Sequence, residues 1–327
     1  MTYFFVNTYQ TLFQCIALHT FSKQSVFYIS NQCVNHLEIK SVLEKNGISC
    51  LIDNEYLRRT KLQRFCVHLQ KFIFYNIFKL KKLDKTLDVY INGSISSKER
   101  LKFVAKADKI HYLDGGYQHY KYEFLGLKNY FYRRVNSSGL ASYFRYVLGF
   151  RLNYEDQNVV DIIYINKTLA NESDCVAAVK SAGKYREEFF LIEELLREQY
   201  KKSIIKELFP DFNFQQTYKN SRKKTICILT QPFSEDGYMS LESNIDIYRV
   251  YLADVVCEDV VVYLKIHPRE SNVKYQMLAK EFDLIKLDGR YPFELFEAHK
   301  IIFDVGVSVN STATYSSCFK TAVFLEI

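Results

Sequence analysis

The sequence predicts an α/β protein made of two domains, each built on a parallel sheet. Short apolar segments alternate with helical patterns from the N-terminus onward, and a second series of the same kind begins after residue 224. The alternation of strand, helix and strand is typical of a parallel sheet with crossover helices. The length of 327 residues also fits about two domains.

The first series contains apolar segments of five residues each, separated by polar or helical sequence. We expect strands at residues 2–6, 25–29, 87–91, 109–113 and 161–165. Residues 186–209 then show helical spacing of apolar residues and end at Pro210, which cannot continue a helix. These elements predict a first domain over residues 1–209.

Residues 210–223 are polar and show no regular spacing of apolar residues, and we predict that they form a linker. The second domain is expected over residues 224–327, with strands at 225–230, 260–266, 282–287, 299–304 and 322–327. Pro232, Pro268 and Pro292 follow or separate these strands. Because proline fixes the backbone, it suits loops that must hold one shape.

The composition limits the class of protein. Since no apolar run approaches the ~18 residues of a membrane span, and no signal-peptide pattern opens the chain, we expect a cytoplasmic protein. The net charge of +7 favours anionic partners. Nucleic acid is not expected among them, because no zinc-finger, helix-turn-helix or RNA-binding pattern occurs. The eight cysteines are scattered, which indicates core thiols and no metal site.

Residues 58–85 carry nine Lys or Arg and one acidic residue, with apolar residues at helical spacing. A helix packed on the core with a solvated basic face fits this pattern. A helix lying on an anionic membrane fits it as well, and would place the protein at the inner face of the cytoplasmic membrane. A basic, non-catalytic membrane-surface binding protein is therefore one alternative function.

Polar residues gather in four loops of the second domain, each next to a predicted strand. The candidates are Asp236 in the first loop, Lys265, His267, Pro268 and Arg269 in the second, Glu294 in the third, and Asn310, Ser311 and Thr312 in the fourth. In open α/β sheets, ligands bind outside the carboxyl ends of the strands. Hydroxyl groups at a helix start bind anions, and the histidine and basic residues add donors and positive charge. Each segment alone also fits a turn or a helix cap, but together they predict a phosphate site.

These segments resemble the bacterial sialyltransferases of glycosyltransferase family 52, the lipooligosaccharide α-2,3-sialyltransferases, which are related more distantly to the capsule polysialyltransferases. The resemblance rests on "KIHPRE" (265–270), "SEDG" (234–237), "YPFELF" (291–296), "NSTATYSS" (310–317) and the opening "VNTYQTLFQ" (6–14). It implies a GT-B fold with the active site between two Rossmann-like domains. It also implies CMP-sialic acid as the donor and inversion at the anomeric carbon.

The resemblance also implies roles for individual residues. His267 would contact the CMP phosphate and assist its departure, and Glu294 would hold the ribose hydroxyls. Ser311 and Thr312 would bind the phosphate. The other nucleotide-side residues would be Lys265, Pro268, Arg269 and Asn310, and the acceptor-side residues would be Thr8 and Gln10.

The catalytic base has two candidates, because related families place it in an acid-acid-Gly motif. Asp236 lies in "SEDG", which matches the motif fully. Asp114 lies in "YLDGGYQHY", where Leu113 stands in the position of the first acid. The first-domain position of Asp114 suits the acceptor side. We favour Asp236, and Asp114 stays open.

The predicted function is therefore an inverting sialyltransferase that acts on a galactose-ended lipooligosaccharide or oligosaccharide. Sialyl transfer needs a carboxylate to take the acceptor proton and a cation or acid to stabilise the departing phosphate. The chain has no D-x-D triplet, so we expect neither a metal nor a cofactor. A GT-B glycosyltransferase with another nucleotide-sugar donor is the enzyme alternative. The acceptor, the linkage, a homodimer and a peripheral membrane contact stay open.

Overall fold

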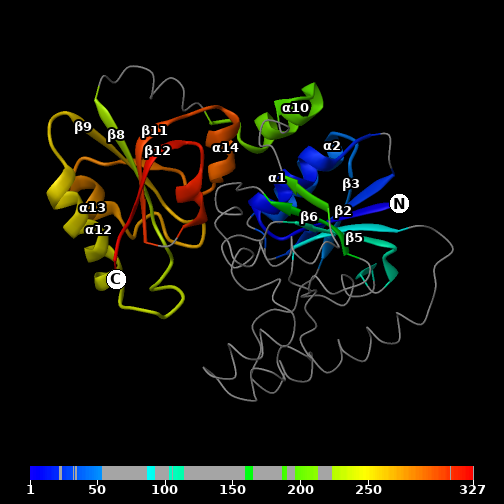
Figure 1. Cartoon of the computed structure of the whole chain (residues 1–327), viewed down its shortest axis with the longest axis horizontal. Coiled ribbons are helices and arrows are strands. Elements are labelled where there is room, and N and C mark those ends of the chain that lie inside the picture. The colour runs from blue at the N-terminus through cyan, green and yellow to red at the C-terminus, as the bar shows by residue number, and fades with distance from the viewer. Residues whose placement is uncertain are drawn as a thin grey trace, which may run out of the picture. The chain divides into compact units, whose positions relative to one another are not determined.

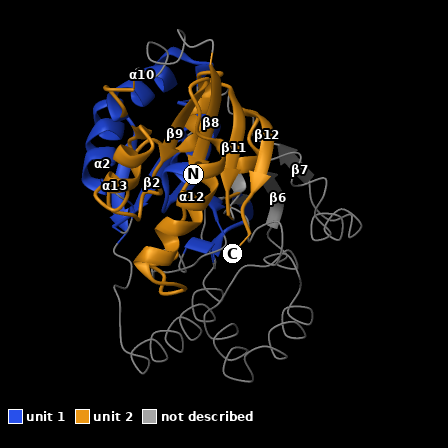
Figure 2. Cartoon of the chain, turned by 90° about the vertical axis from the view of Figure 1, so that its left-hand side faces the viewer, with its two compact units in different colours: residues 1–208 blue, residues 209–327 orange. Residues whose placement is uncertain are grey.

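A computed structural model of the chain describes residues 1–21, 24–31, 33, 35–53, 87–92, 103–104, 106–113, 159–164, 186–189, 196–212, 223–309 and 311–326. The basic segment 58–85, Asp114 and Asn310 lie outside these residues. The chain divides into two compact units, residues 1–208 and 209–327 (Figure 2). Each unit is an α/β structure on a parallel sheet, as the sequence predicts.

The first unit contains a seven-stranded sheet in the part of the chain that the structure describes, with the order β3-β2-β1-β4-β5-β6-β7 (Figure 1). The strands are β1 (Thr2–Val6), β2 (Ser25–Ser30), β3 (Ser49–Asp53), β4 (Asp88–Ile91), β5 (Lys109–Leu113), β6 (Val159–Tyr164) and β7 (Arg186–Phe189). All the described pairs are parallel. The sequence prediction missed both outer strands, β3 and β7.

Three described helices belong to the first unit: α1 (Tyr9–Leu18), α2 (His36–Lys45) and α10 (Gln199–Leu208). The predicted helix over 186–209 is wrong in its first part, because residues 186–189 form β7 and α10 begins only at Gln199. The buried Lys201 fixes α10 to the end of α1, since its Nζ donates to the carbonyl oxygen of Ala17 at 2.7 Å.

The second unit contains a five-stranded parallel sheet among its described residues, in the order β10-β9-β8-β11-β12. The strands are β8 (Lys224–Leu229), β9 (Val260–Lys265), β10 (Ile285–Leu287), β11 (Phe303–Ser308) and β12 (Phe319–Phe324). The helical elements are α12 (Leu241–Val255), α13 (Gln276–Glu281), α14 (Phe293–Ala298) and the 3-10 turn η2 (Thr312–Tyr315). All five predicted strands exist, although β11 and β12 are displaced by three or four residues from the prediction.

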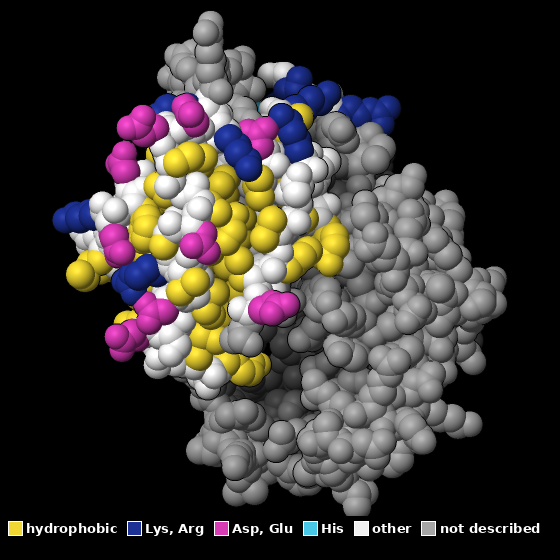
Figure 3. All heavy atoms as spheres, turned by 60° about the vertical axis from the view of Figure 1, so that its left-hand side comes forward, with side chains coloured by type: hydrophobic (Ala, Val, Ile, Leu, Met, Phe, Trp, Pro, Cys, Tyr) yellow, Lys and Arg dark blue, Asp and Glu magenta, His cyan; other side chains and the backbone are white. Residues whose placement is uncertain are grey.

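Two apolar layers cover the sheet of the second unit. Tyr248 and Leu252 of α12 pack with Val262 and Leu264 on one face. Phe293 and Phe296 of α14, together with Tyr263, form the layer on the other face. Figure 3 shows hydrophobic side chains spread over one surface of this unit, with acidic and basic side chains around them.

The strand order of the second unit reverses at β8, which pairs with β9 on one side and β11 on the other. Because all three strands are parallel, their carboxyl ends lie at the same edge of the sheet. This reversal point is where open α/β sheets bind ligands. The loops 230–238, 266–270 and 309–311 begin there.

Candidate active site

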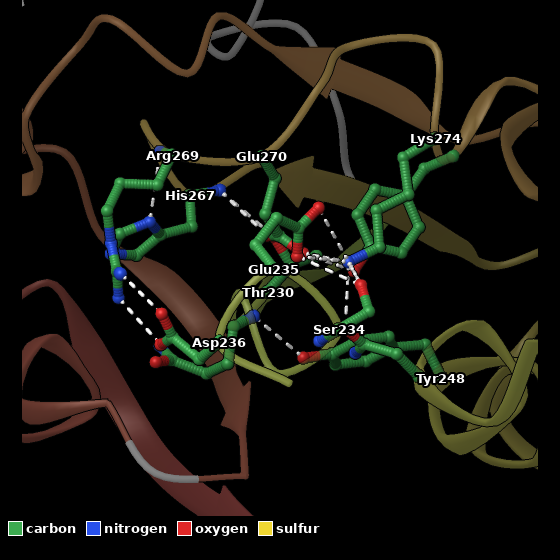
Figure 4. Close-up of polar contacts among 12 residues, drawn as sticks. Thr230, Ser234, Glu235, Asp236, Tyr248, His267, Arg269, Glu270 and Lys274 are labelled. Carbon is green, nitrogen blue, oxygen red and sulfur yellow. Dashed lines mark hydrogen bonds and ion pairs between the residues drawn. The ribbon is translucent and has the colours of Figure 1, made fainter. Parts of the chain in front are cut away.

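Thr230 and His267 meet where β8 and β9 end. The backbone N–H of His267 donates to Thr230 Oγ1 at 3.0 Å and to a carboxylate oxygen of Glu270 at 3.3 Å. The His267 ring is oriented by its own loop, because the backbone N–H of Arg269 donates to Nδ1 at 3.1 Å (Figure 4). A ring whose Nδ1 accepts a hydrogen bond carries its proton on Nε2 when it is neutral.

The surroundings keep the His267 ring neutral. Burial lowers its pKa to about 4, the positive charge of Arg269 adds to this shift, and Glu270 opposes it. At neutral pH the ring is therefore uncharged and can donate a hydrogen bond from Nε2. An oxyanion or a phosphate oxygen is a suitable acceptor for such a donor.

Arg269 and Asp236 form a bidentate ion pair at the surface. The two terminal nitrogens of the guanidinium donate to the two carboxylate oxygens at 2.6 and 2.9 Å (Figure 4). The Asp236 loop is turned by Gly237, whose φ of +76° favours glycine. Each oxygen of Asp236 thus accepts one hydrogen bond from Arg269, and each keeps a further lone pair that could accept a proton.

Lys265 is buried, whereas the side chain of Arg269 is exposed to solvent. Its Nζ donates to the carbonyl oxygens of Ile266 at 3.1 Å and Gly289 at 3.3 Å. Burial lowers its pKa to about 8, while the negative charges near it, including Asp288, act in the opposite direction. Gly289 permits this close approach, because a Cβ there would lie 3.3 Å from the Ile266 oxygen. Lys265 therefore ties the 288–290 turn to the end of β9.

The hydroxyl-rich segment after β11 is held largely by its own side chains. Ser308 Oγ lies 2.6 Å from Thr314 Oγ1 and accepts the backbone N–H of Ser311 at 3.1 Å. Ser316 Oγ donates to Glu297 of α14. Ser311 is half-buried just before η2, which is a single 3-10 turn where the sequence predicted the start of a helix. The side chain of Thr312 lies outside the described residues.

The remaining predicted residues have simpler surroundings. Pro268 is exposed in the turn after His267, and Glu294 is half-buried in the first turn of α14. In the first unit, Thr8 caps α1, because its Oγ1 accepts the backbone N–H of Thr11 at 3.2 Å. Gln10 is half-buried in the first turn of α1.

Three residues that support the site are not among those predicted from the sequence: Thr230, Glu270 and Lys274. Glu270 accepts hydrogen bonds from Thr230 Oγ1 and from Tyr275 Oη, the latter at 2.8 Å. Lys274 Nζ lies 2.6 Å from Glu270 and 3.0 Å from Glu235. The spacing of Glu270 and Lys274, four residues apart, is the sequence signal that could have indicated the pair.

The part of the chain that the structure describes contains neither a metal-binding cluster nor a membrane-spanning helix. Among these residues no group of three or more His, Cys, Asp or Glu side chains could hold a metal ion. None of the described helices has the length and hydropathy to cross a membrane.

The similarity of this chain to a known protein family covers most of its length. A family model described as alpha-2,8-polysialyltransferase (POLYST) matches residues 7–315, so the chain belongs to this family. The protein is therefore a glycosyltransferase. The narrower resemblance to family 52 has no further support from the comparisons, and a comparison with curated proteins gave no match.

Solved structures of bacterial sialyltransferases share the fold at low sequence identity. The GT-B domain of a Photobacterium damselae sialyltransferase has a TM-score of 0.60 at 12% identity, covering 99% of this chain and 91% of that one. An α/β-galactoside α-2,3-sialyltransferase from Photobacterium phosphoreum has a TM-score of 0.58 at 14% identity, covering 98% and 89%. A 2,6-sialyltransferase from Photobacterium sp. JT-ISH-224, solved with CMP and lactose, has a TM-score of 0.60 at 11% identity, covering 98% and 71%.

The state of His267 can be measured directly. We expect nuclear magnetic resonance of the ring nitrogens to show the Nε2–H form at pH 7 and a titration midpoint near 4, because partial burial and the charge of Arg269 both lower the pKa of the ring. The unfolded chain takes up this proton near pH 6.5, so the free energy of unfolding should fall as the pH drops from 6.5 towards 4. In His267→Gln this dependence should be weaker. A midpoint near 6.5 would contradict the described environment.

Proposed function

We propose that the protein is an inverting, metal-independent sialyltransferase that moves sialic acid from CMP-sialic acid to a galactose-ended lipooligosaccharide or oligosaccharide. The observation that carries the proposal is the neutral His267 ring at the carboxyl end of β9, with Nδ1 occupied and Nε2 left to donate. A phosphate monoester leaving group needs such a donor where negative charge develops. No cofactor takes part.

His267 donates from Nε2 to an oxygen of the departing CMP phosphate. Arg269, whose guanidinium is more than half exposed, supplies a mobile positive charge beside it. Ser311, with Asn310 and Thr312, contributes polar groups to the phosphate from the loop after β11. Glu294 accepts hydrogen bonds from the ribose hydroxyls. Lys265 and Pro268 hold the shape of the nucleotide side.

The acceptor hydroxyl loses its proton to Asp236 or to Asp114 as it attacks the anomeric carbon. For Asp236, an incoming donor phosphate offers Arg269 an alternative bidentate partner, which would release the carboxylate to the acceptor. Asp114 lies outside the described residues. Thr8 and Gln10 are the proposed acceptor-side residues of the first unit.

The family match favours a second candidate for the acceptor. Its description names α-2,8-polysialyl transfer, for which the acceptor is a glycan that already ends in sialic acid. The donor, the leaving group and the proposed role of His267 are the same for both acceptors. The two candidates therefore differ only in the sugar bound on the acceptor side.

The proposed donor and the absence of a metal requirement are tested together. CMP should raise the melting temperature more than UMP, UDP or GDP, and EDTA should leave transfer from CMP-sialic acid unchanged. Lactose and a short α-2,8-linked oligosialic acid, offered separately, distinguish the two acceptors. Strict dependence on a divalent metal would contradict the proposal, and so would preferential stabilisation by a uridine or guanosine nucleotide.

The role of His267 predicts a particular pattern of loss. We expect His267→Ala to lower kcat by about 10²-fold or more, the scale for losing an acid or a charge-stabilising donor. The affinity for CMP should fall less, because Glu294 and Ser311 still hold the nucleotide. Steady-state kinetics and calorimetry with CMP measure the two effects. Full turnover in the variant would refute the role.

The two candidate bases are separated by matched substitutions. Asp236→Asn and Asp114→Asn each remove one carboxylate without a change of size. The variant of the true base should lose transfer and keep its CMP affinity nearly intact, since the base contacts the acceptor. If Asp114→Asn is inactive while Asp236→Asn transfers normally, Asp236 is only the partner of Arg269. Loss of activity in neither variant would exclude both assignments.

A further inference from the structure

The carboxylate of Glu270 lies completely buried beneath His267, with a side-chain exposure of 0%. One oxygen accepts from Lys274 Nζ at 2.6 Å and Tyr275 Oη at 2.8 Å. The other accepts from Thr230 Oγ1 and from the His267 backbone N–H. The backbone N–H of Glu270 also donates to the His267 carbonyl at 2.9 Å. Both the N–H and the carbonyl group of His267 are thus hydrogen-bonded to Glu270.

Lys274 extends this connection to the acid loop. Its Nζ, with a side-chain exposure of 2%, also donates to Ser234 Oγ at 2.9 Å, Glu235 at 3.0 Å and Asn244 Oδ1 at 2.8 Å. In Figure 4, dashed lines connect the Lys274 nitrogen both to Glu270 and to the 234–235 segment. A single buried cation therefore joins the loop that follows β9 to the loop that follows β8.

We infer that Glu270 and Lys274 are positioning residues for sialyl transfer: they hold the His267 peptide and the 234–236 loop in one fixed arrangement. For the transfer step, this inference rests on the proposed role of His267. Among the described residues no side chain hydrogen-bonds to the His267 ring, and Nδ1 is held by the backbone of its own turn. The direction of Nε2 therefore depends on the backbone, and small misplacements of a reacting group cost large factors in rate.

The charge of Glu270 also affects the protonation of the His267 ring. The negative charge of Glu270 opposes the lowering of the His267 pKa by burial and by Arg269. If Glu270 becomes neutral, the His267 ring should hold a proton even less readily. A residue that only fills space would not shift this titration.

The test uses a double substitution, because removal of one partner leaves the other charge buried and alone. Glu270→Gln with Lys274→Met removes both charges and keeps the size of each side chain, so the fold should survive. The matched control is Arg249→Gln with Glu281→Gln, which removes an exposed ion pair between α12 and α13. In the control, melting temperature, CMP affinity and kcat should equal those of the unmodified protein.

In the Glu270/Lys274 double variant we expect kcat to fall 10- to 100-fold, while the Kd for CMP changes less than fivefold. Hydrogen exchange of the His267 amide should become at least tenfold faster, although amides in the centre of β8 and β9 exchange as before. The single variant Glu270→Gln should move the His267 titration to lower pH. These readouts separate positioning from a general loss of stability.

The inference is overturned if kcat stays within twofold and the His267 amide keeps its protection. It is also overturned if exchange accelerates equally throughout the second unit, because the pair would then act only on stability. If the unmodified protein transfers no sialic acid, the proposed function fails. The His267 amide exchange and titration, measured without substrate, then still decide whether Glu270 and Lys274 fix this segment.

Discussion

Parallel strand pairing is the constraint on which the site of the second unit depends. Leu229 of β8 pairs with Lys265 of β9 and with Ser308 of β11, so three neighbouring strands end in one row. The next residues leave the sheet together, and Thr230 arrives beside the His267 backbone. Thr230 and His267 are 37 residues apart in the sequence, and the register of β8 and β9 brings them together.

The same edge also determines the electrostatics of the site. Buried ionic groups are costly unless they are paired or hydrogen-bonded: Lys274 is paired with two carboxylates, and Lys265 is hydrogen-bonded to backbone oxygens. Lys274 is surrounded by acceptors, and Lys265 donates to two backbone oxygens. The basic residue that stays exposed beside the neutral His267 is Arg269. A phosphate that approaches this edge therefore meets one neutral donor and one exposed cation.

The sequence predicts β8 and β9 of the second unit most directly, because they are nearly continuous apolar runs, as buried parallel strands require. It misses β3 and β7, the outer strands of the first sheet. "REEF" (186–189) has one apolar residue and precedes a helical pattern, so local spacing favours a longer helix. Tertiary pairing with β6 decides its structure, and a local pattern cannot show that.

The sequence indicates which loops form the site, but it does not show which side chains of these loops contact one another. Lys265, His267 and Arg269 alternate in sequence, which indicates a shared face, but β9 ends at Lys265. Beyond this residue the turn at Pro268 breaks the alternation, and Lys265 points into the unit while Arg269 reaches solvent. Glu270 looks like one more surface acid in the sequence. Its burial follows from Thr230 and Tyr275, whose proximity only the fold creates.

The contact between Arg269 and Asp236 links the two halves of the proposed reaction. An exposed ion pair of this kind contributes only about 0–1 kcal/mol, so an incoming phosphate can take Arg269 from Asp236 at little cost. If Asp236 is the base, this exchange frees its carboxylate from Arg269 as the donor binds, when the acceptor hydroxyl needs it. If Asp114 is the base, the same pair holds the 236 loop against the His267 turn until the phosphate replaces it. In both proposals the donor phosphate changes the partner of Arg269, and the inferred role of the buried Glu270–Lys274 pair is to keep the rest of the site in place during this exchange.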